Sequence, residues 1–444
     1  MAYPTVAFSI FLIFVLVFLR LTQKTVSKSH AFIFTGLLFY AYIQPWMGAF
    51  LLVYAFATAK VGLYLENRKS RTLVWIFCTG SIGFLALCKY FNWGLSWFQI
   101  DPIWPTWAIP AALSFITFQS IWAVLQSYKG EAKDVSLSSR MAHICFFPSL
   151  SSGPIVALSQ WSQAPTPVNT HEALYRIVVG LFQKLVLASI AYELGQVGFS
   201  DAALSSREAL WQSVFAYSFE IYFDFAGYSN MAIGVALLLG MRLPENFNHP
   251  YHAHNIQEFW RRWHISLSTF FRDNVYIHVF GGNRNGVWMQ ARNAIAIMLI
   301  CGLWHGANAT YVIWGLLHGL AIAVVVVLVR KKKTTAHALN IVLTWLFVTY
   351  TWIWFRASGV AEARLIQEGL FVTQGDTEAA PWGWLFLIAC GIWVASEKLV
   401  MSALSKWANS PIHATWKTLS WAIFLILILA LSPRGMPSFI YYQF

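Results

Sequence analysis

The sequence predicts an all-α polytopic membrane protein, with about 11–12 transmembrane helices joined by re-entrant and interfacial segments. Hydrophobic residues make up 58% of the 444 residues, and charged residues only 11%. A soluble chain of this length carries about a quarter charged residues, so this chain requires lipid as its surroundings. The 23 tryptophans are typical of belts at the membrane surface, where an indole ring lies at headgroup level.

Apolar runs separated by basic or turn-forming residues define the expected spans. They cover 5–20, 31–43, 46–65, 73–91, 108–128, 173–199, 209–240, 287–302, 309–329, 338–356, 381–400 and 415–432. Several runs are shorter than the roughly 20 residues of a straight span, whereas 209–240 is long enough to be broken or tilted. No repeat and no soluble domain is visible, so we expect a single integral membrane domain over 1–444.

The net charge of +12 comes from short basic clusters between the apolar runs. This pattern excludes nucleic acid as a partner, because it is typical of cytoplasmic loops that face anionic lipid. No Lys or Arg precedes the first apolar run, so we expect no cleavable signal peptide and an external N-terminus. Successive loops lie on opposite sides of the membrane. Counting from an external N-terminus therefore places 241–286 and Arg330–Lys333 in the cytoplasm and the aromatic tail 433–444 outside.

Two segments depart from the pattern of simple spans. Residues 143–157 are apolar but contain Pro148, Gly153 and Pro154. We expect them to be re-entrant, because non-helical backbone at membrane depth must be surrounded by protein or water. Residues 252–278 mix tryptophan and phenylalanine with arginine, which predicts an interfacial amphipathic helix.

His305 is the first candidate for catalysis, in CGLWHGAN at 301–308 between two apolar runs. Ionisable groups at membrane depth usually serve a function. An imidazole can take a proton from a hydroxyl group and return it to a leaving thiolate. Gly302 and Gly306 flank His305 and allow backbone or substrate to come close. The alternatives are a hydrogen bond between helices or a proton relay in a transporter.

His264 lies in the amphipathic segment, on the helical face that Trp260 and Arg272 would share. Arg261 and Arg262 suit the phosphates of a nucleotide-bearing donor such as coenzyme A. The alternative is that this segment only binds lipid headgroups.

Glu220 and Asp224 stand four residues apart within an apolar run. They are candidates for an acid–base pair or for groups that orient His305. The simpler interpretation is a hydrogen bond from Asp224 to backbone or to Asn230. His318, thirteen residues after His305, is a packing or a relay residue.

His249, His252 and His254 have a spacing that suggests a metal site. Only Glu258 lies near them as a further ligand, so we expect a loop of solvated histidines and no metal.

Several blocks of the sequence resemble one family when they are taken together and in order. The blocks EFWRRWHISLSTFFRDNVYI at 258–277, GGNR at 281–284 and LWHGANATYVIWGLLHG at 303–319 resemble the membrane-bound O-acyltransferase superfamily. The most similar branch is that of the alginate O-acetylases, which modify bacterial exopolysaccharides. Further similarity lies in FFPSLSSGPI at 146–155, IYFDFAGYSNMAIG at 221–234 and PENFNHPY at 244–251. The resemblance implies the family's fold with a central funnel, and an acyltransferase core at about 143–330.

The resemblance also implies roles for residues. His305 matches the family's catalytic histidine, and His264 matches its second recurrent histidine. The aromatic tail resembles a motif whose tyrosine is proposed as an acyl relay, which by position is Tyr441 and not Tyr442. The expected substrate-binding residues are Arg261, Arg262, Arg272, Trp304, Asp224 and Asn248.

The implied reaction moves an acyl group, most simply acetyl, from a cytoplasmic thioester across the membrane for O-acetylation of an extracellular polysaccharide. Acetyl-coenzyme A or a carrier-bound acyl thioester is the expected donor, with no tightly bound cofactor. An extracytoplasmic, hydrolase-like acetyltransferase and a polysaccharide-synthesis complex are the expected partners in the bacterial inner membrane. A teichoic-acid-type D-alanyl transferase and a proton-coupled transporter of polysaccharide precursors are the alternatives.

Overall fold

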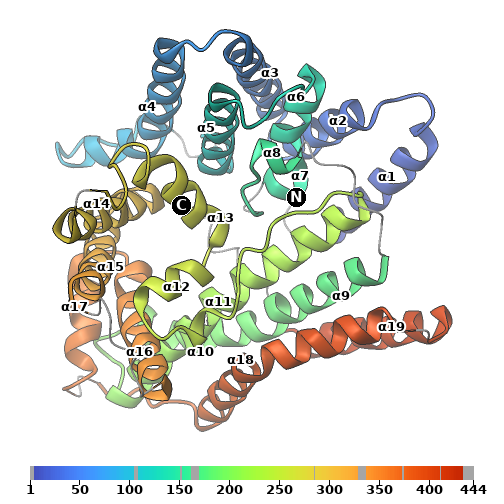
Figure 1. Cartoon of the computed structure of the whole chain (residues 1–444). Helices are drawn as coiled ribbons and strands as arrows, with labels where there is room; N and C mark the ends of the chain where they lie inside the picture. Colours follow the sequence, from blue (N-terminus) through green and yellow to red (C-terminus); the bar gives the residue numbers. More distant parts are fainter. Residues whose placement is uncertain are drawn as a thin grey trace. The chain divides into compact units, whose positions relative to one another are not determined.

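The structure is a computed structural model that describes residues 5–104, 109–150, 153–161, 170–284, 286–328, 337–372, 375–410 and 412–433. These residues are predominantly helical and include no β-strand (Figure 1). The all-α fold class expected from the sequence is therefore confirmed. The chain divides into two compact units, Met1–Ala173 with Met231–Pro244, and Leu174–Asn230 with Glu245–Phe444. The expected single membrane domain stays a prediction.

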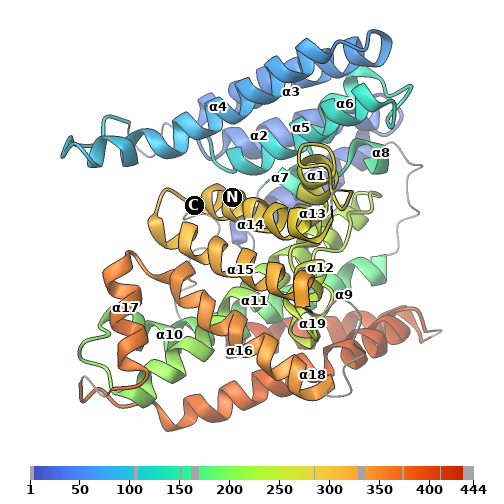
Figure 2. The same cartoon turned by 60° about the vertical axis from the view of Figure 1, so that its left-hand side comes forward.

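The first unit is built from helices that pack through apolar faces, and some of them begin at polar caps. Its helices are α1 (Val6–Thr22), α2 (Lys28–Ala41), α3 (Pro45–Asn67), α4 (Arg71–Ser96), α5 (Leu113–Lys129), α6 (Leu137–Cys145), α7 (Phe147–Leu150) and α8 (Leu158–Trp161). The hydroxyl groups of Ser27 and Ser70 cap α2 and α4 by accepting backbone N–H groups. Helices α2, α3, α5 and α6 lie together in Figure 2 around a cluster that includes Leu51, Ile116 and Ile144.

The described residues of segment 143–157 are irregular, as its prolines and glycine indicate. Helix α6 ends at Cys145, the short α7 follows, and residues 154–157 are buried and have no regular secondary structure. The carbonyl oxygen of Val156 lies 2.8 Å from the Nε2 atom of His143. Protein therefore covers this non-helical backbone and satisfies it in part.

The second unit contains the remaining helices. They are α9 (Thr170–Leu181), the π-helix η2 (Phe182–Ala188), α10 (Ser189–Ser200), α11 (Arg207–Leu238), η3 (Pro250–His252), α12 (Ile256–Arg262), α13 (Ile265–Phe270), the π-helix η4 (Phe271–Tyr276), α14 (Val287–His305), α15 (Ala309–Leu328), α16 (His337–Arg356), α17 (Val360–Gly369), α18 (Pro381–Ala408) and α19 (Ala414–Leu431). Helices α9 and α11 each run from one unit into the other. The run at 209–240, which is long enough to be broken or tilted, is not broken: it is the single α-helix α11 followed by a turn.

Eight helical stretches in the described part of the chain are long and apolar enough to cross a membrane. They are Pro45–Asn67, Arg71–Ser96, Thr170–Ser200, Arg207–Leu238, Val287–His305, Ala309–Leu328, Ala338–Arg356 and Pro381–Ala408. Val6–Thr22 and Thr415–Leu431 are shorter apolar helices, and α2, expected as a span, has 14 residues. Large apolar side chains on these helices are exposed, as Leu385 and Ile392 are on α18. Such side chains require lipid contact, so the protein is a multi-pass membrane protein.

Helices α14 and α15 lie side by side (Figure 1). Glycines on their facing sides allow close backbone contact. A Cβ atom at Gly302 would lie 2.3 Å from the carbonyl oxygen of Tyr311, and one at Gly315 would lie 2.4 Å from that of Met298. No larger side chain fits at such distances, and small residues are the usual means of close helix packing in membranes. This contact fixes the C-terminal end of α14, where His305 lies.

Candidate active site

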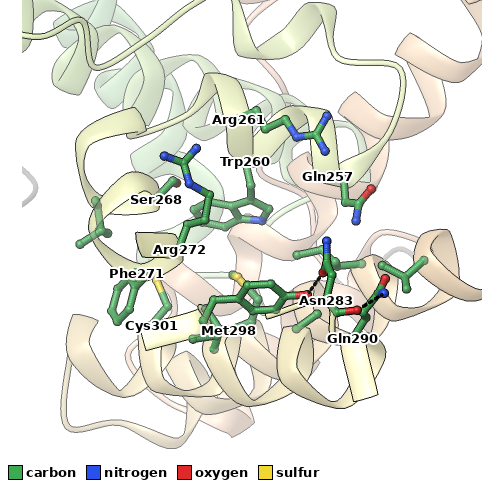
Figure 3. Close-up of a pocket in the computed structure, with 16 residues that line it drawn as sticks. Gln257, Trp260, Arg261, Ser268, Phe271, Arg272, Asn283, Gln290, Met298 and Cys301 are labelled. Atoms are coloured by element: carbon green, nitrogen blue, oxygen red, sulfur yellow. Dashed lines mark hydrogen bonds between the residues drawn. The ribbon is translucent and has the colours of Figure 1, made fainter. Parts of the chain in front are cut away.

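A pocket of about 290 Å³ lies within the second unit, between α12–η4 and α14–α15 (Figure 3). One wall is polar and cationic, with Gln257, Arg261 and Arg272 on the α12–η4 side. The opposite wall consists mainly of Ala294, Ile297, Met298 and Cys301 from α14 and Ile322 and Val326 from α15. Such a pocket suits a ligand with an anionic group and an apolar arm.

The arginines in and beside this wall differ in their ion pairs. Arg272 is exposed and forms an ion pair with the neighbouring Asp273, with 2.7 Å between Nε and Oδ1. Arg261 is exposed, and none of the described carboxylates forms an ion pair with it. Arg262 lies outside the pocket lining and donates to Glu258 one turn earlier, at 2.6 Å. Of the three arginines expected to bind substrate, the structure therefore places Arg261 and Arg272 at the pocket.

The expectation of one continuous amphipathic helix over 252–278 is wrong. Helix α12 ends at Arg262, Trp263 is extended, and His264 adopts a left-handed backbone with φ +43° before α13 begins. Two backbone hydrogen bonds hold this break, from Asn248 N–H to the Arg262 carbonyl and from Ile265 N–H to the Asn246 carbonyl, both 2.9 Å. Long-range pairing overrides the local helical pattern here, so Trp260, His264 and Arg272 do not share one helical face.

His264 is buried at this break, with 1% of its surface exposed. Its Nδ1 atom lies 3.2 Å from the side-chain oxygen of Asn246, and its ring packs edge-on to Phe225 at 4.7 Å between centroids. Burial lowers the pKa of His264 to about 3. The imidazole is therefore neutral at physiological pH.

His305 is the last residue of α14 and is enclosed by aromatic rings. Its ring centroid lies 4.9 Å from that of Phe355 and 5.3 Å from that of Trp314, both in edge-to-face contact. Trp304 contacts both histidines, at 4.7 Å from His305 and 6.3 Å from His264. The structure thus brings His305, Trp304 and His264 into one cluster.

The aromatic enclosure depends on the glycine that follows His305. A Cβ atom at Gly306 would lie 2.5 Å from the ring of Tyr311, which in turn packs against Phe355. Glycine at this position therefore allows the close approach that the sequence suggested.

His318 is completely buried and has both ring nitrogens engaged. The indole N–H of Trp260 donates to Nδ1 at 3.2 Å, and Nε2 lies 2.9 Å from the hydroxyl oxygen of Thr351. Trp260 lines the pocket, so His318 fixes part of its wall. Between the packing and relay alternatives, these contacts favour a packing role.

Glu220 and Asp224 form ion pairs with cations that the sequence analysis did not single out. Asp224 pairs with Lys184 from η2, and Glu220 accepts from Arg356 of α16 at 2.7 Å. All four side chains are largely buried, so each charge is compensated within the protein. The hydrogen bond proposed from Asp224 to Asn230 is replaced by one from Asn230 to Gln183, 2.9 Å long. The sequence did contain a signal for these pairs: Lys184 lies within an apolar run and Arg356 lies at the end of another, and such cations usually need a partner.

The expectation of solvated histidines at 249–254 is also wrong. His249 bonds the buried carboxylate of Glu397 at 3.1 Å, and His252 bonds the carbonyl oxygen of Val394 at 2.9 Å. His254 bonds Glu258 at 2.9 Å. The chain folds this loop against α18, which the local sequence does not reveal. Among the described residues, no group of three His, Cys, Asp or Glu side chains could hold a metal ion.

Two further expected residues have different outcomes. Asn248 contributes backbone groups to the break at His264, while the side chain in contact with His264 is that of Asn246, which the sequence analysis missed. Asn246 lies in the PENFNHPY block, and the resemblance of that block to the family was the signal that the sequence offered. Tyr441 lies outside the described residues.

Comparison with known proteins decides the family. Residues 50–361 match the sequence profile of MBOAT, the membrane-bound O-acyltransferase family. The chain belongs to this family. It is therefore an O-acyltransferase, and the matched region contains His264, Trp304, His305 and the pocket.

Relatives of this O-acyltransferase are named as O-acetyltransferases, alginate O-acetylases and D-alanyltransferases. The peptidoglycan O-acetyltransferase of Helicobacter pylori is 32% identical over 391 residues, which cover 77% of this chain and 73% of the relative. The probable alginate O-acetylase AlgI of Pseudomonas aeruginosa is 35% identical over 355 residues, covering 75% and 68%. A teichoic acid D-alanyltransferase of Bacillus subtilis is 27% identical over 287 residues, covering 58% and 69%. The similarity to the alginate O-acetylase branch is thus confirmed.

Proposed function

We propose that this O-acyltransferase takes an acetyl group from a cytoplasmic thioester and delivers it across the bacterial inner membrane for O-acetylation of an extracellular polysaccharide. The acetyl group is supported by the names of the relatives that match most of this chain, an O-acetyltransferase and alginate O-acetylases. Acetyl-coenzyme A or a carrier-bound acetyl thioester is the donor. No internal repeat of the kind found in transporters is visible in the sequence.

The observation that carries this proposal is the position of the pocket relative to His305. The α14 wall runs from Gln290 to Cys301, eleven residues or about 16 Å along the helix. Cys301 lies one helical turn before His305, about 6 Å along the axis. An extended pantetheine-type arm spans such a wall. Its phosphate end suits Arg261 and Arg272, and its thioester end then approaches the histidine cluster.

The chemistry follows from a histidine enclosed by aromatic rings. His305 takes the proton of the acceptor hydroxyl, whose oxygen forms a bond to the thioester carbonyl carbon. The carbon–sulfur bond breaks, and the proton passes from His305 to the leaving thiolate. Rings of Trp304, Trp314 and Phe355 keep bulk water from this carbon, which limits hydrolysis of the thioester.

The sidedness follows the distribution of basic residues. Positive loops face the cytoplasm, so we place 241–286 and the pocket that it helps to form on that side. Both termini are then extracytoplasmic. We propose Tyr441 of the external tail, or a hydroxyl of the partner acetyltransferase, as the acceptor that passes the acetyl group to the polymer.

The test is the acetyl-ester content of the polymer secreted by cells that carry His305→Ala. We expect normal secretion of a polymer that has lost its acetyl esters. The matched control is His30→Ala, which removes an exposed histidine of the first unit and should leave acetylation unchanged. Retained acetylation in the His305 variant, or loss of secretion itself, overturns the proposal. Mass analysis of the released ester group separates acetate from D-alanine, and D-alanine would contradict acetyl transfer.

A further inference from the structure

Asn246 is a completely buried asparagine whose side chain meets His264 at the break and Ser266 at the start of α13. Its side-chain oxygen accepts the backbone N–H of Ser266 at 3.3 Å and the Ser266 hydroxyl at 2.9 Å. Its amide nitrogen donates to the hydroxyl oxygen of Ser229 on α11 at 3.2 Å. The backbone carbonyl of Asn246 also accepts the N–H of Ile265. Asn246 therefore holds the α13 side of the strained left-handed backbone at His264, and the N–H of Asn248 holds the α12 side.

These contacts fix the orientation of the Asn246 amide. A backbone N–H can only donate, so the side-chain atom of Asn246 that faces Ser266 must be the oxygen. The same oxygen faces Nδ1 of His264 at 3.2 Å. Because an amide oxygen only accepts, Nδ1 must carry a hydrogen.

A neutral imidazole carries one ring hydrogen, so a hydrogen on Nδ1 leaves the lone pair on Nε2. The low pKa that burial gives His264 supports the neutral form. An imidazole in this state accepts a hydrogen bond at Nε2, and it cannot donate one there to an oxyanion.

His318 shows the opposite arrangement in the same unit. The indole N–H of Trp260 donates to Nδ1, so the ring hydrogen lies on Nε2 and points to Thr351. The Thr351 hydroxyl donates onward to the carbonyl oxygen of Val348 at 2.8 Å, which leaves its lone pairs to accept from His318. The lone pair of His318 is thus occupied by a tryptophan of the pocket wall. The two buried histidines have different fixed tautomers and suit different tasks.

We propose that Asn246 is a positioning residue that locks His264 as its Nδ1–H tautomer, so that Nε2 accepts the hydrogen bond of the acyl acceptor's hydroxyl group. This inference rests on the proposed function, because it assumes that transfer to a hydroxyl takes place beside His264 and His305. His264 then holds the acceptor's hydroxyl group in the bound state. As the oxygen forms its bond to the thioester carbonyl carbon, the hydroxyl hydrogen turns from Nε2 of His264 to His305, which takes it as a proton. The assignment gives the two histidines separate roles that the family membership alone does not distinguish.

The first test compares Asn246→Leu in two backgrounds, the wild-type chain and the His264→Gln variant. Inverted membrane vesicles from the producing cell receive isotopically labelled acetyl-coenzyme A, and the label that enters the polymer is measured per folded protein. We expect Asn246→Leu to slow transfer about 10- to 100-fold in the wild-type background and to have no additional effect in the His264→Gln background. An equal loss in both backgrounds assigns Asn246 a merely structural role and overturns the inference. Gln119→Leu, which removes a buried amide that donates to the His143 carbonyl in the first unit, is the matched control.

A second variant covers the case in which Asn246→Leu does not fold. Asn246→Asp keeps the acceptor for His264 and Ser266 and adds a negative charge that raises the pKa of His264. We expect transfer to continue, with the acid limb of its pH profile moved upward by about 1–3 pH units. An unchanged pH profile contradicts the contact between these side chains during turnover.

Nitrogen-15 NMR of the histidine-labelled full-length protein reads the tautomer directly. The His264→Gln spectrum identifies the His264 signals by difference, and we expect a protonated Nδ1 and an unprotonated Nε2. The reverse assignment overturns the inference. If His305→Ala transfers acetyl groups as the wild type does, the proposed function fails instead, whatever the Asn246 variants show. If His305→Ala is inactive while His264→Gln transfers at the wild-type rate, only the role of Asn246 and His264 fails.

Discussion

Replacement of Gly302 with alanine is expected to displace His305 and to slow acyl transfer. Gly302 lies three residues before His305 in α14, where this helix touches the backbone of α15. A Cβ atom at position 302 would lie 2.3 Å from the carbonyl oxygen of Tyr311, against 3.4 Å for ordinary contact, a shortfall of 1.1 Å. The obstructing atom belongs to the backbone, so a side-chain rotation cannot relieve the clash and the two helices must separate locally.

The size of the effect follows from this displacement. A shift of about 1 Å at a reacting group lowers the rate by about 10²-fold. This factor corresponds to about 2.7 kcal/mol of activation free energy. The strained contact between α14 and α15 should also lower the free energy of unfolding by about 1–3 kcal/mol, as overpacking of a close-packed interior generally does.

The assay is the transfer of labelled acetyl groups to the polymer in vesicles, normalised to folded protein and paired with thermal unfolding in detergent. Gly391→Ala is the matched control, because no atom lies within 4 Å of a Cβ added at this glycine of α18. We expect the control to keep the wild-type rate. If Gly302→Ala also transferred at the wild-type rate, close packing of α14 on α15 would not position His305, and the reasoning would be refuted.

Three further predictions concern charge. Asp224→Asn removes the carboxylate that compensates the buried ammonium group of Lys184, so thermal unfolding should show a loss of about 3–5 kcal/mol. Arg261→Ala and Arg272→Ala should each raise the KM for acetyl-coenzyme A about 10-fold in initial-rate measurements and change kcat little, because these residues bind the phosphate end of the donor. Burial lowers the pKa of His264 from 6.5 to about 3, so below about pH 6 the unfolded chain binds a proton that the folded chain does not. The free energy of unfolding should therefore fall by up to about 1.4 kcal/mol per pH unit on acidification. In unfolding measurements from pH 7 to 4.5, the His264→Gln variant should lack this part of the pH dependence.

Each of these predictions has a control and a contradicting result. Asp201→Asn, an exposed carboxylate, should leave the unfolding temperature unchanged, and equal stability of the Asp224 variant would show that the buried pair contributes nothing net. Arg364→Ala, an exposed arginine of α17 outside the pocket, should keep the wild-type KM. An unchanged KM in both pocket variants would place the donor elsewhere. If the free energy of unfolding had the same pH dependence in the wild type and in His264→Gln, His264 would titrate in the folded protein as it does in the unfolded chain.

The sequence alone determined the elements whose causes are local. Apolar runs predicted α14 and α15 to within a few residues, because the length of a span is set by membrane thickness. Composition fixed the all-α membrane class for the same reason, since only internally hydrogen-bonded helices or closed barrels cross lipid. The position of His305 at the end of an apolar run, with glycines on both sides, also pointed correctly to a close-packed buried site.

Only the tertiary structure decided which polar groups meet. Lys184 pairs with Asp224 forty residues away, and Arg356 pairs with Glu220 across 136 residues, separations that no helical spacing encodes. The break at His264 likewise arises from hydrogen bonds to the segment around Asn246, which override a locally helical pattern. Helix formation depends on neighbours three or four residues apart, whereas the compensation of a buried charge or lone pair depends on whatever side chain the fold brings within about 3 Å. The candidate catalytic histidines could therefore be named from the sequence, but their hydrogen-bond partners could not.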